Sequence, residues 1–189
     1  LQTLQAALDW SHALLSAQEQ TVFRRLGAFV GGFTLELAQQ VAGEVQLDEW
    51  AVLDALSALV DKSMVAVQGG DTPRYALLET TRAYALQMLT QAGEAGALWQ
   101  RHARAVLALF ERADEERFGE QGTLSEDSYI ERLLPEFDNL RAALAWAEGN
   151  DGNQSLAIAL AGASAAAFPV VGRAAESNAV LRRLMPRVP

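Results

Sequence analysis

The side chains that could perform chemistry are few in this chain, and the densest group lies near its start. Asp9, Ser11 and His12 supply the residue types of a hydrolytic triad within a short stretch. These positions are expected on one helix, where adjacent residues point in different directions, so Ser11 and His12 cannot share a proton productively. We therefore expect His12 to be a solvated or interface histidine, and we predict no catalysis at this site.

The other candidates for chemistry have simpler structural explanations. His102 lies beside Arg101 and Arg104 on an expected polar helix face, and two histidines in separate halves of the chain give no zinc-ligand spacing. Gly31-Gly32 and Gly69-Gly70 are not followed by the Lys-Ser/Thr of a phosphate-binding loop, so a helix end and a hairpin turn explain them. The chain has no cysteine, which excludes disulfides and thiolate metal sites. We predict neither enzyme activity nor a metal site.

The elements that would position any site are clearest between Leu59 and Ala85, where the hydrophobic period changes twice. The helical spacing that leads to Val60 gives way to a short apolar run, turn-forming residues and a second extended run from Arg74 to Leu78, which together predict a β-hairpin. Helical spacing then returns from Tyr84. One hairpin between helices is the order of a winged-helix unit.

Helices are expected through the rest of the chain. In the first half they should cover residues 1–15, a segment from Ser16 to Gly31-Gly32, a segment from Thr34 to Gly43, and a segment from Asp48 to about Val60. Beyond Gly93 only helices are expected, and the last stretch predicts two helices broken near Pro169 to Gly172. The predicted fold class is mainly α, with a winged-helix domain over residues 1–92 and antiparallel helical repeats over residues 93–189.

Charge and hydrophobicity restrict the partners. Lys and Arg number 15 against 24 for Asp and Glu, a net charge of −9, which opposes attraction to nucleic acid. The helix from Asp48 to Val60 carries no basic side chain, which disfavours direct DNA contact. The Ala-rich stretch from Ser155 to Val171 is interrupted by Gly162 and Pro169, so no membrane span is expected. The basic residues of the first half that could contact phosphates are Arg24, Arg25, Lys62, Arg74 and Arg82.

The four tryptophans are expected to be packing anchors. They are Trp10, Trp50, Trp99 and Trp146.

Several segments resemble a known family. The chain up to about Glu148 is similar to the winged-helix part, and the start of the helical repeats, of bacterial STAND (NB-ARC-like) ATPases, the signal-transduction ATPases with numerous domains. The segments that carry the resemblance are Leu8-Asp9-Trp10-Ser11, Phe23-Arg24-Arg25-Leu26, Phe29-Val30-Gly31-Gly32-Phe33-Thr34, Leu59-Val60-Asp61-Lys62-Ser63, Arg74-Tyr75-Ala76-Leu77-Leu78-Glu79-Thr80-Thr81-Arg82 and Glu136-Phe137-Asp138-Asn139-Leu140-Arg141.

This resemblance implies a place within a larger transcriptional regulator. It implies a nucleotide-binding domain of the same chain, holding ATP or ADP with Mg²⁺, on which the winged helix packs, and tetratricopeptide-like helices that sense a protein or small-molecule activator. The phosphate-binding loop is absent here, so no cofactor is expected in this piece. Leu1 is not an initiator Met, and we expect a piece of a larger cytoplasmic protein.

Asp61, Lys62 and Ser63 are the residues predicted to contact the nucleotide-binding domain, because they lie between the third winged-helix helix and the first strand. The simpler interpretation of these residues is a turn with a local ion pair. The alternative function is a DNA-binding winged-helix regulator with a helical sensor or dimerisation domain, and a basic surface on the hairpin or the third helix would distinguish it.

Overall fold

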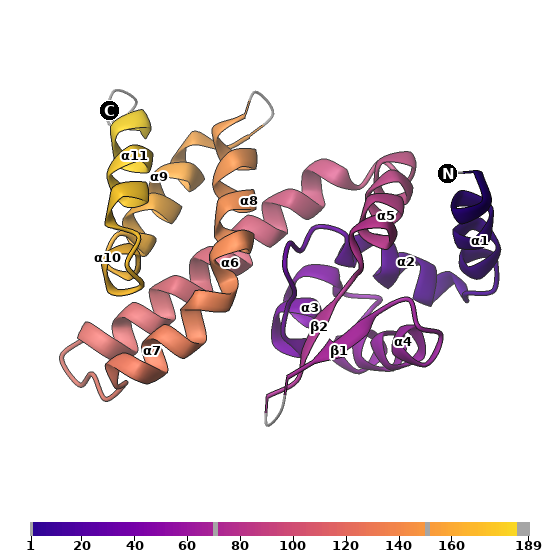
Figure 1. Ribbon diagram of the computed structural model, residues 1–189, viewed down its shortest axis with the longest axis horizontal. Helices are drawn as coiled ribbons and strands as arrows, with labels where there is room; N and C mark the ends of the chain where they lie inside the picture. Colours follow the sequence, from indigo (N-terminus) through magenta and orange to yellow (C-terminus); the bar gives the residue numbers. More distant parts are fainter. Residues whose placement is uncertain (1, 70–71, 150–151, 185–189) are drawn as a thin grey trace. The chain divides into compact units, whose positions relative to one another are not determined.

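The computed structural model describes residues 2–69, 72–149 and 152–184, and the chain forms two compact units, Leu1–Leu98 and Trp99–Pro189 (Figure 1). The fold is mainly helical, with one antiparallel hairpin in a winged-helix arrangement followed by further helices, as the sequence predicts. None of the helices in the described ranges is both long enough and apolar enough to cross a membrane.

The first unit contains five helices and a hairpin, and it ends within the first turn of α6. Its elements are α1 (Gln2–Ala13), α2 (Ala17–Leu26), α3 (Leu35–Ala42), α4 (Glu49–Asp61), β1 (Ala66–Gln68), β2 (Arg74–Ala76), α5 (Glu79–Gln91) and the start of α6 (Ala95–Phe118).

Side-chain caps define where the winged-helix helices begin. Ser16 and Glu19 form the predicted capping box at α2, in which each side chain accepts a hydrogen bond from the other residue's backbone N–H. Thr34 caps α3 and Asp48 caps α4 more simply, because each side chain accepts one hydrogen bond, from the backbone N–H of Leu37 and of Ala51. These polar residues mark the N-terminus of each helix, so they determine the lengths of the intervening turns.

The end of α2 differs from the prediction. The helix stops at Leu26 with Gly27 as its C-cap, several residues before Gly31-Gly32. The glycines instead belong to the following turn, where both have positive φ (76° and 120°). Phe29 stacks on Phe33 with ring centroids 4.6 Å apart, so the apolar residues that suggested a longer helix are used in the turn.

α2 lies at the centre of the first unit and contacts α3, α4 and α5. Its side chains Val22, Phe23 and Leu26 are fully buried, as are Leu37 of α3 and Leu56 of α4. Phe33 and Tyr84 are buried too. Trp10 and Trp50, by contrast, are 68% and 74% exposed, so the prediction that all four tryptophans anchor the core is wrong for these two.

The hairpin gains a third segment from a distant part of the chain. β1 and β2 pair antiparallel with Val67 opposite Tyr75. Phe33 also bridges to Tyr75, and the two residues exchange backbone hydrogen bonds of 2.8 Å each. This pairing fastens the hairpin to the helical core.

The second unit is entirely helical in its described part. It contains most of α6, then α7 (Glu126–Leu133), the 3₁₀ turn η1 (Leu134–Glu136), α8 (Phe137–Glu148), α9 (Gln154–Ser164), the single turn α10 (Ala167–Val170) and α11 (Ala174–Leu184). Pro169 lies inside α10, so the predicted break takes the form of an additional short helix rather than a loop. Proline is tolerated there because the first turn of a helix needs no N–H partner.

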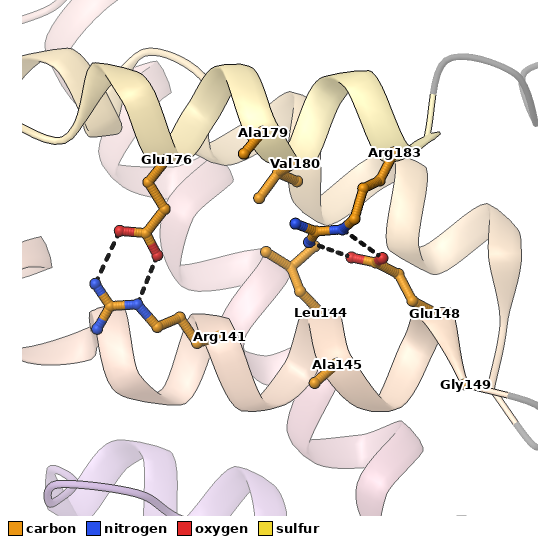
Figure 2. Close-up of a pocket in the computed structure, with 9 residues that line it drawn as sticks. All are labelled: Arg141, Leu144, Ala145, Glu148, Gly149, Glu176, Ala179, Val180 and Arg183. Atoms are coloured by element: carbon orange, nitrogen blue, oxygen red, sulfur yellow. Dashed lines mark hydrogen bonds and ion pairs between the residues drawn. The ribbon is translucent and has the colours of Figure 1, made fainter.

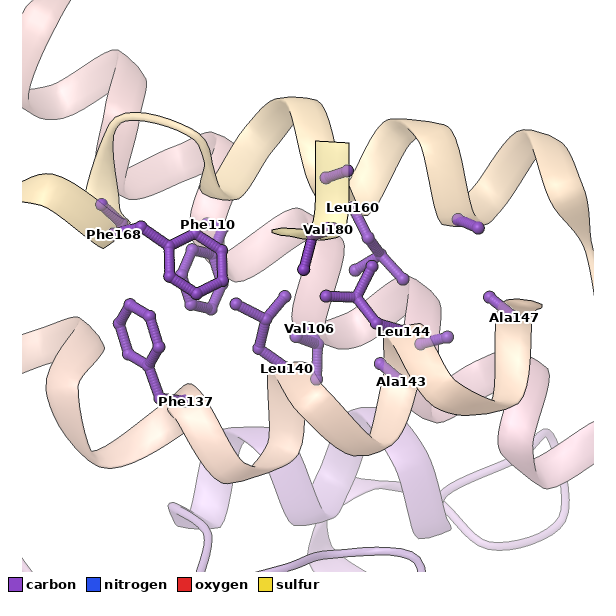
Figure 3. Close-up of a cluster of buried hydrophobic side chains, with 14 of the residues drawn as sticks. Val106, Phe110, Phe137, Leu140, Ala143, Leu144, Ala147, Leu160, Phe168 and Val180 are labelled. Carbon is purple, nitrogen blue, oxygen red and sulfur yellow. The ribbon is translucent and has the colours of Figure 1, made fainter. Parts of the chain in front are cut away.

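The core of the second unit is built around aromatic side chains (Figure 3). Phe137 makes edge contacts with Phe110 and Phe168, at centroid distances of 5.9 and 5.1 Å. The Ala-rich face of α9 is also inside, with Ala157 and Ala161 buried, so these small side chains pack internally. His102 is fully buried as well, which corrects the expected polar surface position.

Candidate functional site

The helix that precedes the hairpin, α4, is the element that a winged helix ordinarily presents to a partner. It carries acidic side chains at Glu49, Asp54 and Asp61 and no basic one, and its cap is Asp48. The exposed side of α4 is therefore acidic, and it begins with the exposed ring of Trp50.

Two of the winged-helix cations are held in a cluster inside the first unit. Arg24 and Arg25 of α2 both bind the carboxylate of Glu94, at 2.5 and 2.8 Å, and Glu94 immediately precedes α6. Arg25 is only 5% exposed, and it also donates to the carbonyl of Ala42 and to Glu44. Burial alone would raise the pKa of Glu94, but the hydrogen bonds from the two arginines outweigh it and the pKa is lowered. These arginines stabilise the fold and are committed to internal partners.

Lys62 and Arg82 are also paired internally. Lys62 Nζ lies 2.5 Å from an oxygen of Glu19, and Arg82 donates from Nε to the carbonyl of Phe29 at 2.6 Å. The fifth cation, Arg74, is on β2 and half-buried. Thus Arg24, Arg25 and Arg82 are largely covered, whereas Lys62 stays exposed while it is paired with Glu19.

Asp61, Lys62 and Ser63 lie together where α4 ends, and all three are exposed. Lys62 is the C-cap of α4, and its ion pair with Glu19 spans 43 residues, so it ties the end of α4 to the start of α2 rather than closing a local turn. Ser63 has φ of 57°, the left-handed conformation that non-glycine residues seldom adopt. The role predicted for these residues, contact with a nucleotide-binding domain, stays a prediction.

Asp9 and His12, two residues of the apparent triad, make packing and hydrogen-bond contacts with other helices. Asp9 accepts a hydrogen bond of 2.8 Å from the hydroxyl of Tyr84, and burial together with this bond raises the Tyr84 pKa to about 12. His12 packs against the rings of Phe23 and Tyr84, and burial lowers its pKa. This group joins α1 to α2 and α5. Among the described residues, no cluster of three or more His, Cys, Asp or Glu side chains could hold a metal ion.

The second unit has a groove between α8 and α11 of about 390 Å³ (Figure 2). An ion pair lies at each end, Arg141 with Glu176 and Arg183 with Glu148, and each pair makes two hydrogen bonds of 2.6 to 3.0 Å. Leu144 and Val180 lie between the pairs. Both pairs join residues 35 positions apart, so α8 and α11 run in the same direction.

Sequence reasoning missed Glu44, Glu94 and the two ion pairs of the groove. No local signal could have identified the Arg25 and Glu94 pair, because the partners are 69 positions apart and only folding brings them together.

A domain comparison agrees with this architecture. Residues 15–90 match the family of the winged helix-turn-helix domain. The matched range starts just before α2 and ends within α5, so it contains the helices and the hairpin described above. The chain therefore contains a winged helix-turn-helix domain.

Two mycobacterial relatives extend the similarity into the helical unit. The chain is 46% identical over 151 residues to the protein named "Putative HTH-type transcriptional regulator Rv0890c" of Mycobacterium tuberculosis, and equally to the one named "Putative HTH-type transcriptional regulator Mb0914c" of Mycobacterium bovis. The match covers 79% of this chain but only 16% of either relative. The chain is thus homologous to about a sixth of proteins named as regulators.

A third relative is shorter. The "Uncharacterized protein Rv0894" of Mycobacterium tuberculosis is 42% identical over 103 residues, which is 53% of this chain and 26% of that protein. No solved structure matches the chain significantly.

Proposed function

We propose that this chain is a regulatory segment of a larger helix-turn-helix transcriptional regulator and that its winged helix supplies a contact surface. The observation that carries the proposal is the winged helix-turn-helix match over residues 15–90, together with 46% identity over 151 residues to relatives named as regulators. The folded hairpin, the capped helices and the buried core of the first unit support it, because they form a complete winged-helix unit.

The comparisons support the DNA-binding alternative better than the ATPase interpretation, since the domain family and the names of the relatives both refer to a helix-turn-helix. In that mode α4 would enter the major groove and the hairpin would follow the phosphate backbone. The charges disfavour DNA contact through α4, because Glu49 and Asp54 would face phosphates. They favour a different surface of the domain for DNA contact.

The acidic exposed side of α4 supports the second mode, in which the winged helix binds protein. Arg24, Arg25 and Lys62 are all engaged by carboxylates of the first unit, so forming a basic face there would require breaking those ion pairs. The matched region is 16% of each relative, so the DNA-binding part of such a regulator need not be this segment.

The STAND ATPase context is a finer proposal that rests on sequence resemblance. In it, a domain of the same chain that lies outside these 189 residues holds ATP or ADP with Mg²⁺, and the exposed Asp61, Lys62 and Ser63 contact that domain. The 35-residue offset between the parallel helices α8 and α11 supports tetratricopeptide-like repeats, whose period is about 34 residues. The activator of those helices would be a protein or a small molecule, and the protein would be cytoplasmic.

A duplex-DNA titration at low and physiological salt separates the two modes. In the DNA mode, binding weakens steeply with salt, and Asp54→Lys on α4 raises the affinity by about tenfold through removal of a repelling charge. The matched control is Glu120→Lys, which makes the same charge change at an exposed position of the second unit. In the protein mode neither the chain nor the Asp54 variant binds DNA more tightly than the control.

A parallel titration with labelled ATP tests the ATPase context. We expect no tight ATP binding by this chain, because the phosphate-binding loop is absent from its sequence. Tight binding would contradict the assignment of the nucleotide site to a domain outside these 189 residues.

A further inference from the structure

The turn that joins α3 to α4 presents two large apolar side chains to solvent. We define the α3–α4 corner as residues 43–50 (Figure 1). Val45 is fully exposed and Trp50 is 74% exposed, whereas Leu47 between them is buried in the core. An exposed tryptophan and an exposed aliphatic side chain within one eight-residue segment are typical of a binding surface.

Hydrogen bonds and an ion pair hold the backbone of the corner in place. Glu44 and Leu47 exchange backbone hydrogen bonds of 3.0 and 2.9 Å that close the turn. The buried guanidinium of Arg25 holds the Glu44 carboxylate at 3.0 Å, and the Gln39 side chain donates to the carbonyl of Glu49. A surface held in this way loses little conformational entropy when it binds.

The corner also encloses a groove of about 390 Å³ whose charge is acidic. Its lining includes Glu44, Leu47, Asp48, Glu49 and Trp50. Among the described residues Glu49 has no side-chain hydrogen bond or ion pair, so its carboxylate is available to a partner. No lysine or arginine occurs anywhere from Gly43 to Asp61.

We propose that the α3–α4 corner is a docking surface for a basic, partly apolar segment of a protein partner. An arginine or lysine of the partner stacks on the Trp50 ring while its charge faces Glu49, and an apolar neighbour covers Val45. The charge complementarity selects this occupant, because a tryptophan face next to carboxylates attracts cations and repels phosphates. This inference rests on the proposed regulatory role of the winged helix and names the chemistry of its partner.

The test uses nuclear magnetic resonance of the indole N–H groups of the 189-residue chain. The probe is a synthetic peptide of alternating arginine and leucine pairs, compared with a peptide of alternating glutamate and leucine pairs and with duplex DNA. Trp50→Phe assigns the Trp50 signal. We expect the arginine peptide to shift the Trp50 signal and to leave the Trp10 signal in place.

Affinity measurements with labelled peptide complete the experiment. Trp50→Ala should weaken binding at least tenfold and Glu49→Lys about fivefold, and higher salt should weaken it further. Trp10→Ala removes a tryptophan that is similarly exposed, and Glu79→Lys reverses an exposed charge of the same domain, so both should bind as the unchanged chain does.

Several results would overturn the docking surface. Equal binding of the two peptides, equal losses in the Trp10 and Trp50 variants, or no binding of the arginine peptide would each do so while leaving the regulatory role intact. A Trp50 shift caused by DNA would replace the protein partner with DNA. If the regulatory role itself were wrong, two results would appear together. The arginine peptide would not bind at the α3–α4 corner, and the chain would show enzymatic activity.

Discussion

Glu94 is the residue on which two cations of the first unit depend. Its carboxylate is bound by Arg24 and Arg25, and Arg25 is almost completely buried. Removal of the charge would leave Arg25 with only Glu44 and the Ala42 carbonyl as partners. A buried cation that loses an anion is costly because the interior cannot solvate it.

We therefore expect Glu94→Gln to lower the free energy of unfolding by about 2 kcal/mol in urea denaturation followed by circular dichroism. The control is Glu79→Gln, since that carboxylate is 85% exposed and lies 3.8 Å from Arg82. Exposed pairs of this kind contribute little. Equal effects of the two substitutions would contradict a structural role of the buried cluster.

His12 makes the stability of the first unit depend on pH. Burial lowers its pKa, the charge of Arg24 lowers it further, and the charge of Asp9 opposes both. The folded state therefore binds the proton more weakly than the unfolded state, whose histidine pKa is about 6.5. Stability should be complete above that pH and should fall as the pH decreases below it.

The measurement is urea unfolding at about pH 7.5 and about pH 5.5 for the unchanged chain and for His12→Gln. We expect the unchanged chain to lose more stability on acidification than the variant, which has no titrating group at this position. Parallel losses in the two proteins would show that His12 is equally basic in both states.

At the scale of elements, the turn between α4 and β1 contains a strained residue. Ser63 has φ of 57° and is exposed, so its side chain gains no burial in return for the left-handed conformation. Ser63→Gly should raise the free energy of unfolding by about 0.5 kcal/mol, since glycine adopts this φ without strain but loses more chain entropy. Ser63→Val should lower it by about 1 kcal/mol or more. Thermal unfolding would reveal the opposite signs, and equal melting temperatures would contradict the strain.

The contact between α8 and α11 includes two partly exposed ion pairs. The side chains of Arg141 and Glu176 are 37% and 32% exposed, and hydrogen bonding to Arg141 lowers the Glu176 pKa. A double-mutant cycle with Arg141→Gln and Glu176→Gln should give a coupling of about 1 kcal/mol that shrinks at high salt. The matched cycle on Arg183 and Glu148, whose side chains are 54% and 17% exposed, should give a coupling of similar size. Zero coupling in both cycles would mean that apolar packing alone joins these helices.

At the scale of the whole molecule, each unit contains its own buried core. Phe23 is fully buried in the first unit and Phe110 in the second. Phe23→Ala should destabilise the first unit by about 3 to 5 kcal/mol through loss of burial and creation of a cavity. Hydrogen exchange read by mass spectrometry should then rise over α2 to α5 and stay unchanged over α7 to α11.

The reciprocal variant, Phe110→Ala, should raise exchange over α7 to α11 and leave the winged helix protected. A rise across both units in either variant would contradict independent cores and would indicate one cooperative fold.

Much of the architecture follows from local sequence signals. Ser16, Thr34 and Asp48 mark helix starts because each side chain can satisfy backbone N–H groups within three residues. The hairpin is predictable from the change to an extended pattern around turn residues. The length of α2 is not predictable from the sequence, because Phe29 has the spacing of a continued helix. Its actual partner, Phe33, lies in the following turn.

By itself the sequence determined the order of the elements, the helix caps and the acidic character of α4, since these depend on composition and on neighbours a few positions away. Only the tertiary structure decided which charges are available. Arg25 and Glu94, like Arg141 and Glu176, are joined by folding across long stretches of chain. The exposure of Trp50 is also a tertiary property, because an apolar side chain has the same identity whether its surroundings bury it or leave it to a partner.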